Sequence, residues 1–199
     1  MTFHHKQDER FAKSVLFVAF ANLTYFFVEF IVANDIHSTS LFADSIDFLE
    51  DASVNILIFL ALGWSLKNKV RLGKCLAVIL VIPALAFLYT AWQKFNIPSI
   101  PDPSILSLTG GGALLVNLSC AFILIRFRHH QGSLTRAAFL SARNDALANI
   151  GIIIAGLIGY VWLSMWPDLI VGLLIMAINL DAAKEIWEAS EHDEISSRP

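Results

Sequence analysis

The run of residues 104–125 contains no charged side chain. A helix rises about 1.5 Å per residue, so this run can cross the hydrocarbon core of a bilayer, which is about 30 Å thick. The whole chain of 199 residues is 56% hydrophobic and only 16% charged, with a mean hydropathy of +0.64. This composition excludes most water-soluble folds. We therefore predict an all-α, polytopic membrane protein.

Six apolar runs are predicted to be transmembrane helices. They cover residues 13–33, 42–66, 75–93, 104–126, 136–163 and 167–188. The sixth run requires Asp168 and Asp181 to lie at the two membrane interfaces, because only 169–180 is free of charge. The connections, at 34–41, 67–74, 94–103, 127–135 and 164–166, are too short for a soluble domain. Residues 1–12 are then an N-terminal tail, 13–188 a six-helix transmembrane domain and 189–199 a short C-terminal tail.

Lysine and arginine are distributed very unevenly over the two sides of this six-helix arrangement. Lys94 lies alone on one side, whereas twelve basic residues lie on the other: Lys6, Arg10, Lys13, Lys67, Lys69, Arg71, Lys74, Arg126, Arg128, Arg136, Lys184 and Arg198. Short loops rich in these residues stay in the cytoplasm. We expect both termini to be cytoplasmic, in a multi-pass protein of a bacterial inner (plasma) membrane.

Charge and cysteine content argue against nucleic-acid binding and against cysteine-based sites. The net charge is −3 and the basic residues form no stripe with interleaved aromatics, so we expect no nucleic acid. Cys75 and Cys120 lie on different apolar runs without CxxC or Cys/His spacing, which argues against a disulfide framework and a thiolate zinc site. We expect both cysteines to be packing residues.

The second apolar run opens with four acidic residues, Asp44, Asp47, Glu50 and Asp51. A carboxylate inside a membrane is costly and usually functional. Asp47 and Asp51 are four residues apart, so they share a helix face and can chelate one cation. The alternative is that the cluster is an exposed start of a span beginning near Ala52, which leaves only about 15 apolar residues, too few to cross.

The fifth run places three oxygen-bearing side chains, Ser141, Asp145 and Asn149, on one helix face at four-residue spacing. Arg143 points about 200° around the helix from Asp145, and its long stem suits the cytoplasmic head groups. The alternative for Asp145 is a structural carboxylate bonded to a donor on a neighbouring helix. By rise per residue, Asp47 lies about 9 Å from the outer end of its helix and Asp145 about 13 Å from the inner end of its own. Straight, untilted helices would therefore not bring the two together.

The remaining polar residues and the glycines inside the apolar runs do not indicate a metal site on their own. Glu29 either lines an outer exit path or is an interfacial carboxylate, and we leave both open. Asn22, Asn117 and Asn179 are expected to form interhelical hydrogen bonds. The glycines at 110–112 are read as hinges or as sites of close packing, and Gly151, Ala155 and Gly159 as ordinary packing.

Four segments together carry a family resemblance: residues 38–51, Leu115-Val-Asn-Leu-Ser, Asp145-Ala-Leu-Ala-Asn-Ile-Gly and Trp166-Pro-Asp-Leu-Ile-Val-Gly. In order and spacing they resemble the cation diffusion facilitators, which are proton-coupled exporters of divalent metals. The resemblance covers nearly the whole chain and implies that Asp47 and Asp51 bind the metal. Two features depart from the family. Ser141 stands where His or Asp is usual, so Ser141, Asn149 or water would complete the site. The chain also ends within 12 residues of Trp187, without the usual soluble cytoplasmic domain.

The acidic residues and the resemblance together predict a proton-coupled efflux of a divalent transition-metal ion by alternating access. Asp47, Asp51 and Asp145 would bind the ion, with Ser141 or Asn149 as an auxiliary oxygen ligand. Cation and protons compete for the same carboxylates, because binding requires deprotonated ligands. Oxygen ligands suit manganese, iron(II) or magnesium, while zinc, cobalt and cadmium stay open. No resident cofactor is expected, since the cation is the substrate.

Two alternatives belong to other functional classes. One is a membrane enzyme that holds magnesium at Asp44, Asp47 and Asp51 to act on lipid phosphates. The basic residues that would bind phosphate lie on the other side, which disfavours it. The second is a transport-inactive relative that serves as a partner subunit, motivated by Ser141 and the short C-terminus. Expected partners are the divalent ion, protons, the lipid bilayer and a second copy in a homodimer. Metal identity, oligomeric state, transport direction and the roles of Arg143 and Glu29 are left open.

Overall fold

The structure is a computed structural model that describes the backbone of residues 2–61, 85, 87–126 and 133–178, and side chains of 9–60, 85, 87–126 and 144–178. The labelled helices are α1 (Thr2–Asp35), α2 (Thr39–Ala61), α4 (Pro103–Ile125) and α5 (Ser133–Gly159). Residues 85 and 87–96 are also helical, and a last helix covers Trp166–Ile178. The described residues contain no strand, which confirms the all-α prediction for this part of the chain.

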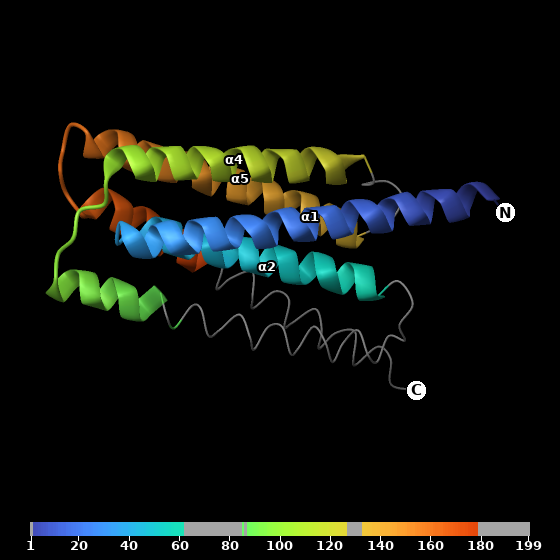
Figure 1. Cartoon of the computed structure of the whole chain (residues 1–199), viewed down its shortest axis with the longest axis horizontal. Coiled ribbons are helices and arrows are strands. Elements are labelled where there is room, and N and C mark those ends of the chain that lie inside the picture. The colour runs from blue at the N-terminus through green and yellow to red at the C-terminus, as the bar shows by residue number, and fades with distance from the viewer. Residues whose placement is uncertain (1, 62–84, 86, 127–132, 179–199) are drawn as a thin grey trace.

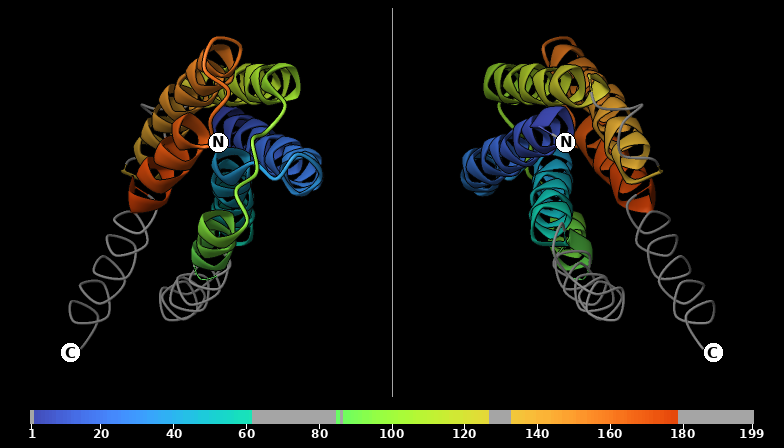
Figure 2. Two further views of the ribbon diagram at one scale, coloured as in Figure 1. Left: turned by 90° about the vertical axis from the view of Figure 1, so that its left-hand side faces the viewer. Right: turned by 90° about the vertical axis from the view of Figure 1, so that its right-hand side faces the viewer.

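The helices run side by side along the long axis of the molecule (Figure 1). Contacts are most extensive between α4 and α5 and between α1 and α2, while α1 also touches α4 and α2 touches α5. Seen end-on (Figure 2), the helix over 87–96 lies along α2 on the side away from α4. The connections 36–38, 97–102 and 160–165 all lie at one end of the bundle, opposite the start of α1. These are the three connections predicted to lie outside the cell.

Two helices among the described residues, Glu9–Asp35 and Pro103–Ile125, are long and apolar enough to cross a membrane by length and composition. Asn144–Gly159 and Trp166–Ile178 are shorter apolar helices. Large apolar side chains lie exposed on the outside of the bundle, for example Phe20, Leu108 and Leu115 at 68–79% exposure. An apolar exterior of this kind suits contact with lipid. Six membrane crossings stay a prediction.

Some helices differ in extent from the predicted spans. Helix α1 begins at Thr2, before the predicted span 13–33, because its polar start also favours helix and includes an i,i+4 ion pair between Glu9 and Lys13. Helix α5 ends at Gly159 instead of 163, where the chain turns through hydrogen bonds from the Val161 and Trp162 amides to the Ile158 carbonyl. The predicted connection 67–74 lies outside the described residues, as do residues 127–132 of the predicted connection 127–135, whose residues 133–135 instead belong to α5.

Close packing explains most of the glycines. A Cβ added at Gly110 would lie 2.8 Å from Ile152 on α5, and one at Gly159 would lie 3.0 Å from Pro103 on α4. Gly112 packs in the same way against Tyr25 of α1. Gly151 and Gly159 of α5 pack against different neighbours, because Gly151 contacts Val171 of the last helix. For Gly110 and Gly112 the structure thus favours close packing over a hinge.

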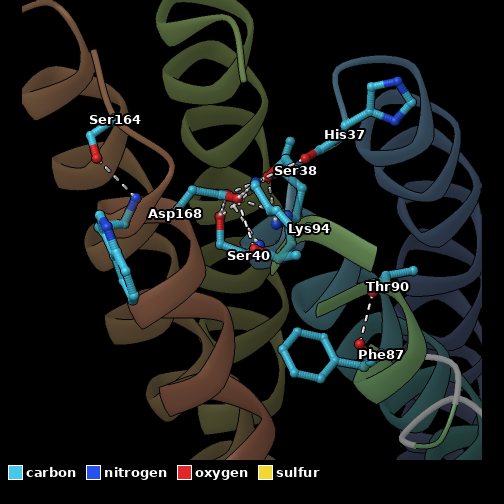
Figure 3. Close-up of polar contacts among 11 residues, drawn as sticks. His37, Ser38, Ser40, Phe87, Thr90, Lys94, Ser164 and Asp168 are labelled. Atoms are coloured by element: carbon cyan, nitrogen blue, oxygen red, sulfur yellow. Dashed lines mark hydrogen bonds and ion pairs between the residues drawn. The ribbon is translucent and has the colours of Figure 1, made fainter. Parts of the chain in front are cut away.

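Asp168 of the last helix caps the start of α2 (Figure 3). Its Oδ2 accepts hydrogen bonds from the Thr39 amide and the Thr39 hydroxyl, both at 2.8 Å. Its Oδ1 accepts from the Ser38 and Ser40 hydroxyls, both at 2.6 Å, and from the Ser40 amide at 3.1 Å. A carboxylate at this position satisfies amides that the helix itself leaves unpaired and complements the helix dipole.

Lys94 completes the same cluster. Its Nζ lies 2.6 Å from Asp168 Oδ2 and donates to the His37 carbonyl at 2.9 Å. Both ion-pair side chains are about 3% exposed or less. One prediction is corrected, because Lys94 belongs to the helix over 87–96 and not to a connection. Asp168 is buried near the start of the last helix, and its place at a membrane interface stays a prediction. Gly172 permits the approach, since a Cβ there would lie 2.9 Å from the Thr39 carbonyl carbon.

Removing the Asp168 carboxylate is expected to destabilise the bundle strongly. Asp168→Ala leaves a buried lysine and several buried donors unpaired, which costs about 3–5 kcal/mol. A matched control is Asp102→Ala, which removes the exposed cap of α4, where Asp102 Oδ1 accepts from the Ser104 and Ile105 amides. That cap is worth about 1 kcal/mol. Thermal unfolding in detergent, followed by circular dichroism, measures the difference, and equal losses in the two variants would contradict the structural role of Asp168.

Candidate functional site

The acidic stripe of α2 faces the inside of the bundle. Asp44, Asp47, Asp51 and Asn55 are each at most 9% exposed, and Glu50 is partly buried. They are buried together because residues spaced by three or four positions share one helix face. Helix α2 begins at Thr39, well before the cluster, so the interpretation of these residues as an exposed start of a span near Ala52 is wrong.

Asp145 of α5 lies at the level of this stripe. Its carboxyl group is within hydrogen-bonding reach of Asp51, which is also its strongest electrostatic neighbour, and Asp145 is in turn the strongest electrostatic neighbour of Asp47. Asp145 is partly exposed as a residue, but its Oδ2 is fully buried with no hydrogen-bond partner among the described residues. Two helices far apart in the sequence therefore bring three carboxyl groups to one region of the interior.

Asn149 fixes the register of α2 against α5. Its Nδ2 donates to Asp44 Oδ2 at 2.5 Å, and its Oδ1 accepts from Asn117 Nδ2 of α4 at 2.9 Å. The two helices are antiparallel, so one turn back along α5 from Asn149 places Asp145 opposite the next turn of α2 (Figure 1). The interhelical hydrogen bond expected of Asn117 is confirmed.

The same register removes the depth difficulty raised by the sequence. Asn149 bonds to Asp44, and counted from this bond toward the end of the bundle opposite the described connections, Asp145 lies four residues along α5, while Asp47 and Asp51 lie three and seven residues along α2. These steps correspond to about 6 Å, about 5 Å and about 10 Å, so the level of Asp145 falls between those of Asp47 and Asp51.

Glu29 of α1 lies beside this region. It is fully buried, and its carboxyl group is within hydrogen-bonding reach of Asp44. Its place in an outer exit path or at the membrane interface stays a prediction. One turn earlier on α1, Tyr25 donates its hydroxyl to the Thr109 carbonyl of α4 at 2.7 Å. Tyr25 was not singled out from the sequence, although its spacing of four from Glu29 places both on one face.

For some of the predicted residues the structure describes only the backbone, or nothing. The Ser141 backbone lies in α5 one turn before Asp145, but the side chains of Ser141 and Arg143, like Asn179, lie outside the described part. Asn22 is buried, and its Oδ1 accepts a contact of 3.8 Å from the thiol of Cys120, a free and buried cysteine. Among the described side chains, no three His, Cys, Asp or Glu residues are close enough to share one metal ion.

Chemically, this interior offers anionic oxygen ligands. Carboxylates bind divalent cations and protons in competition, whereas the amides of Asn117 and Asn149 carry no charge, and in this structure they orient Asp44. The ion pairs of Glu9 with Lys13 and of Asp168 with Lys94 do not involve Asp44, Asp47 or Asp145. The arrangement suits a site that holds a cation reversibly.

Comparison with known proteins gives the family. Residues 15–190 match the model of the cation efflux transmembrane domain. The zinc transporter ZitB of Escherichia coli (strain K12) is 23% identical over 212 residues, an alignment that covers 100% of this chain and 67% of the relative. The protein of the same name from Shigella flexneri matches with the same identity and coverage.

These matches also decide between the functional classes considered from the sequence. The membrane enzyme acting on lipid phosphates is wrong, because the match covers most of the chain and is to a transport domain. The chain therefore belongs to the cation efflux, or cation diffusion facilitator, family of integral membrane transporters of divalent metal cations.

Proposed function

We propose that this protein exports a divalent transition-metal ion in exchange for protons, by alternating access to a site made by Asp47, Asp51 and Asp145. The observation that supports the proposal is pairwise: inside the bundle Asp145 of α5 lies within hydrogen-bonding reach of Asp51 of α2 and is the strongest electrostatic neighbour of Asp47. The three carboxyl groups would have to draw closer around a bound ion than they are in this structure. Residues 13–188 would be the transport domain, and 1–12 and 189–199 cytoplasmic tails. The protein would lie in a bacterial inner membrane, with the described connections on the outer side.

The exchange follows from the charges. Three buried carboxylates repel one another and do not all stay ionised without a cation. A divalent ion neutralises two of them and displaces the protons that the empty site holds. When the site opens to the other side, protons in turn displace the metal. One site that binds either species, but not both, couples the two fluxes.

An auxiliary ligand would complete the site. Ser141 lies one turn from Asp145 on the same face of α5 and supplies a hydroxyl oxygen. Asn149 is the second choice, since its amide oxygen accepts from Asn117 and would have to release that bond to reach the metal. Ser141 is therefore the better candidate.

The metal is proposed only as a class. An all-oxygen site suits manganese and iron(II) better than a site with histidine would. Carboxylates also bind zinc, and zinc is the ion in the printed name of the relatives. A second copy would add a homodimer partner but no ligand to this site.

Asp51→Asn and Asp145→Asn should each abolish metal transport. The substitutions keep the side-chain shape and remove one of the charges that bind the ion, so uptake into inverted membrane vesicles should fall at least about tenfold, which corresponds to about 1.4 kcal/mol of lost binding. Asp102→Asn, at the exposed start of α4, is the matched control and should transport normally. Normal transport by both site variants would refute the assignment.

Proton release should accompany metal transport. In vesicles containing the purified protein, a panel of zinc, manganese, iron, cobalt, cadmium and magnesium should give a pH change only for transported ions. A transport-inactive relative would give none for any metal.

Metal affinity should fall as the pH falls. Because binding releases protons, the apparent dissociation constant should rise by up to about tenfold per pH unit for each proton displaced, as linkage requires. Titration of the purified protein with zinc between pH 6 and pH 8 measures this slope. An affinity independent of pH would contradict competition between protons and metal at one site.

A further inference from the structure

A second pair of carboxylates lies beside the proposed site. Glu29 of α1 and Asp44 of α2 are both fully buried, at 0% exposure, and their carboxyl groups are within hydrogen-bonding reach of each other. Two ionised carboxylates are both acceptors and cannot satisfy each other, so both oxygens of Glu29 and the Oδ1 of Asp44 have no hydrogen-bond donor among the described residues. Three buried, unsatisfied carboxylate oxygens thus meet between two helices.

Asp44 is held in place from the other side. Its Oδ2 accepts from Asn149, whose own amide oxygen accepts from Asn117. This chain of two side-chain amides joins α2, α5 and α4 and leaves Oδ1 of Asp44 free. An amide donor orients a carboxylate but does not neutralise its charge.

The described part of the chain supplies no cation to this pair. Its ion pairs are Lys13 with Glu9 and Lys94 with Asp168, and neither lysine contacts Glu29 or Asp44. A buried carboxylate without a partner is costly. Two of them together match the charge of one divalent ion, and carboxylate oxygens are the ligands that such ions prefer in proteins.

The pair is displaced from the proposed transport site toward one end of the bundle. Asp44 precedes Asp47 by three residues and Asp51 by seven, so it lies about 5 Å and about 10 Å nearer the start of α2. That start lies at the end with the connections 36–38, 97–102 and 160–165. An ion that leaves Asp47 and Asp51 toward this end passes Glu29 and Asp44.

Resting on the transport function proposed above, we propose that Glu29 and Asp44 form a second divalent-cation site, on the outward side of the first, which the exported ion occupies before release. The two sites use different carboxylates. Removing one site should therefore leave the other able to bind metal.

The test is the number of metal ions bound by the purified full chain. Isothermal titration with Zn²⁺, and in parallel with Mn²⁺, compares the wild type with Glu29→Gln, Asp145→Asn and the double variant. Each single variant should bind one ion fewer than the wild type, and the double variant two fewer. Using differences removes the contribution of any other metal-binding group. Gel filtration and thermal unfolding confirm that each variant is folded.

Glu50→Gln is the matched control. Glu50 is a partly buried acid of the same helix that belongs to neither pair, so the number of bound ions should stay at the wild-type value. Loss of an ion in this variant would show that the counts report only the total negative charge, and would overturn the second site.

The two proposals fail separately. If folded Glu29→Gln binds as many ions as the wild type, or loses two ions at once, the second site is wrong, and the first is still judged by Asp145→Asn. If Asp145→Asn binds as many ions as the wild type, the transport site itself is wrong.

Discussion

A carboxylate buried away from water must be neutralised, and this requirement organises the described structure. Asp168 meets it within the protein, with one lysine and five further donors around its two oxygens. The cluster ties the start of α2 to the last helix and to the helix over 87–96 (Figure 3). Because both of its oxygens already have partners, Asp168 is not available to bind a metal ion and has a structural role.

The acids of α1, α2 and α5 have the opposite surroundings. Glu29, Asp44 and Asp145 keep unsatisfied oxygens, and their described neighbours are amides, a phenol and other acids. The same type of side chain is thus structural in one place and able to bind an exchangeable ion in another. What separates the two roles among the described residues is the ion pair of Asp168 with Lys94, which Glu29, Asp44 and Asp145 do not have.

Much of the architecture could be predicted from the sequence, because length and apolarity decide whether a segment is a membrane helix. The uncharged run that became α4 differs from its predicted bounds by a single residue at each end. Helix ends were predicted less well. The polar start of α1 continues the helix beyond the apolar run, and the end of α5 depends on where Gly159 packs against Pro103. Such contacts depend on the neighbouring helix, which hydropathy does not describe.

The acids of the site could also be found from the sequence, since charged residues in apolar runs are rare and stand out. Their partners could not be found in this way. Nothing in the spacing within α2 or α5 shows that Asn149 bonds Asp44, yet this one bond sets which turns of the two helices lie opposite each other. The sequence does indicate a helix start at 38–40, because its three hydroxyl residues are typical of that position. That signal predicts a cap on α2 but not that the capping carboxylate comes from the last helix. Local chemistry therefore identifies which groups need a partner, and only the packing of the bundle decides which of them find one.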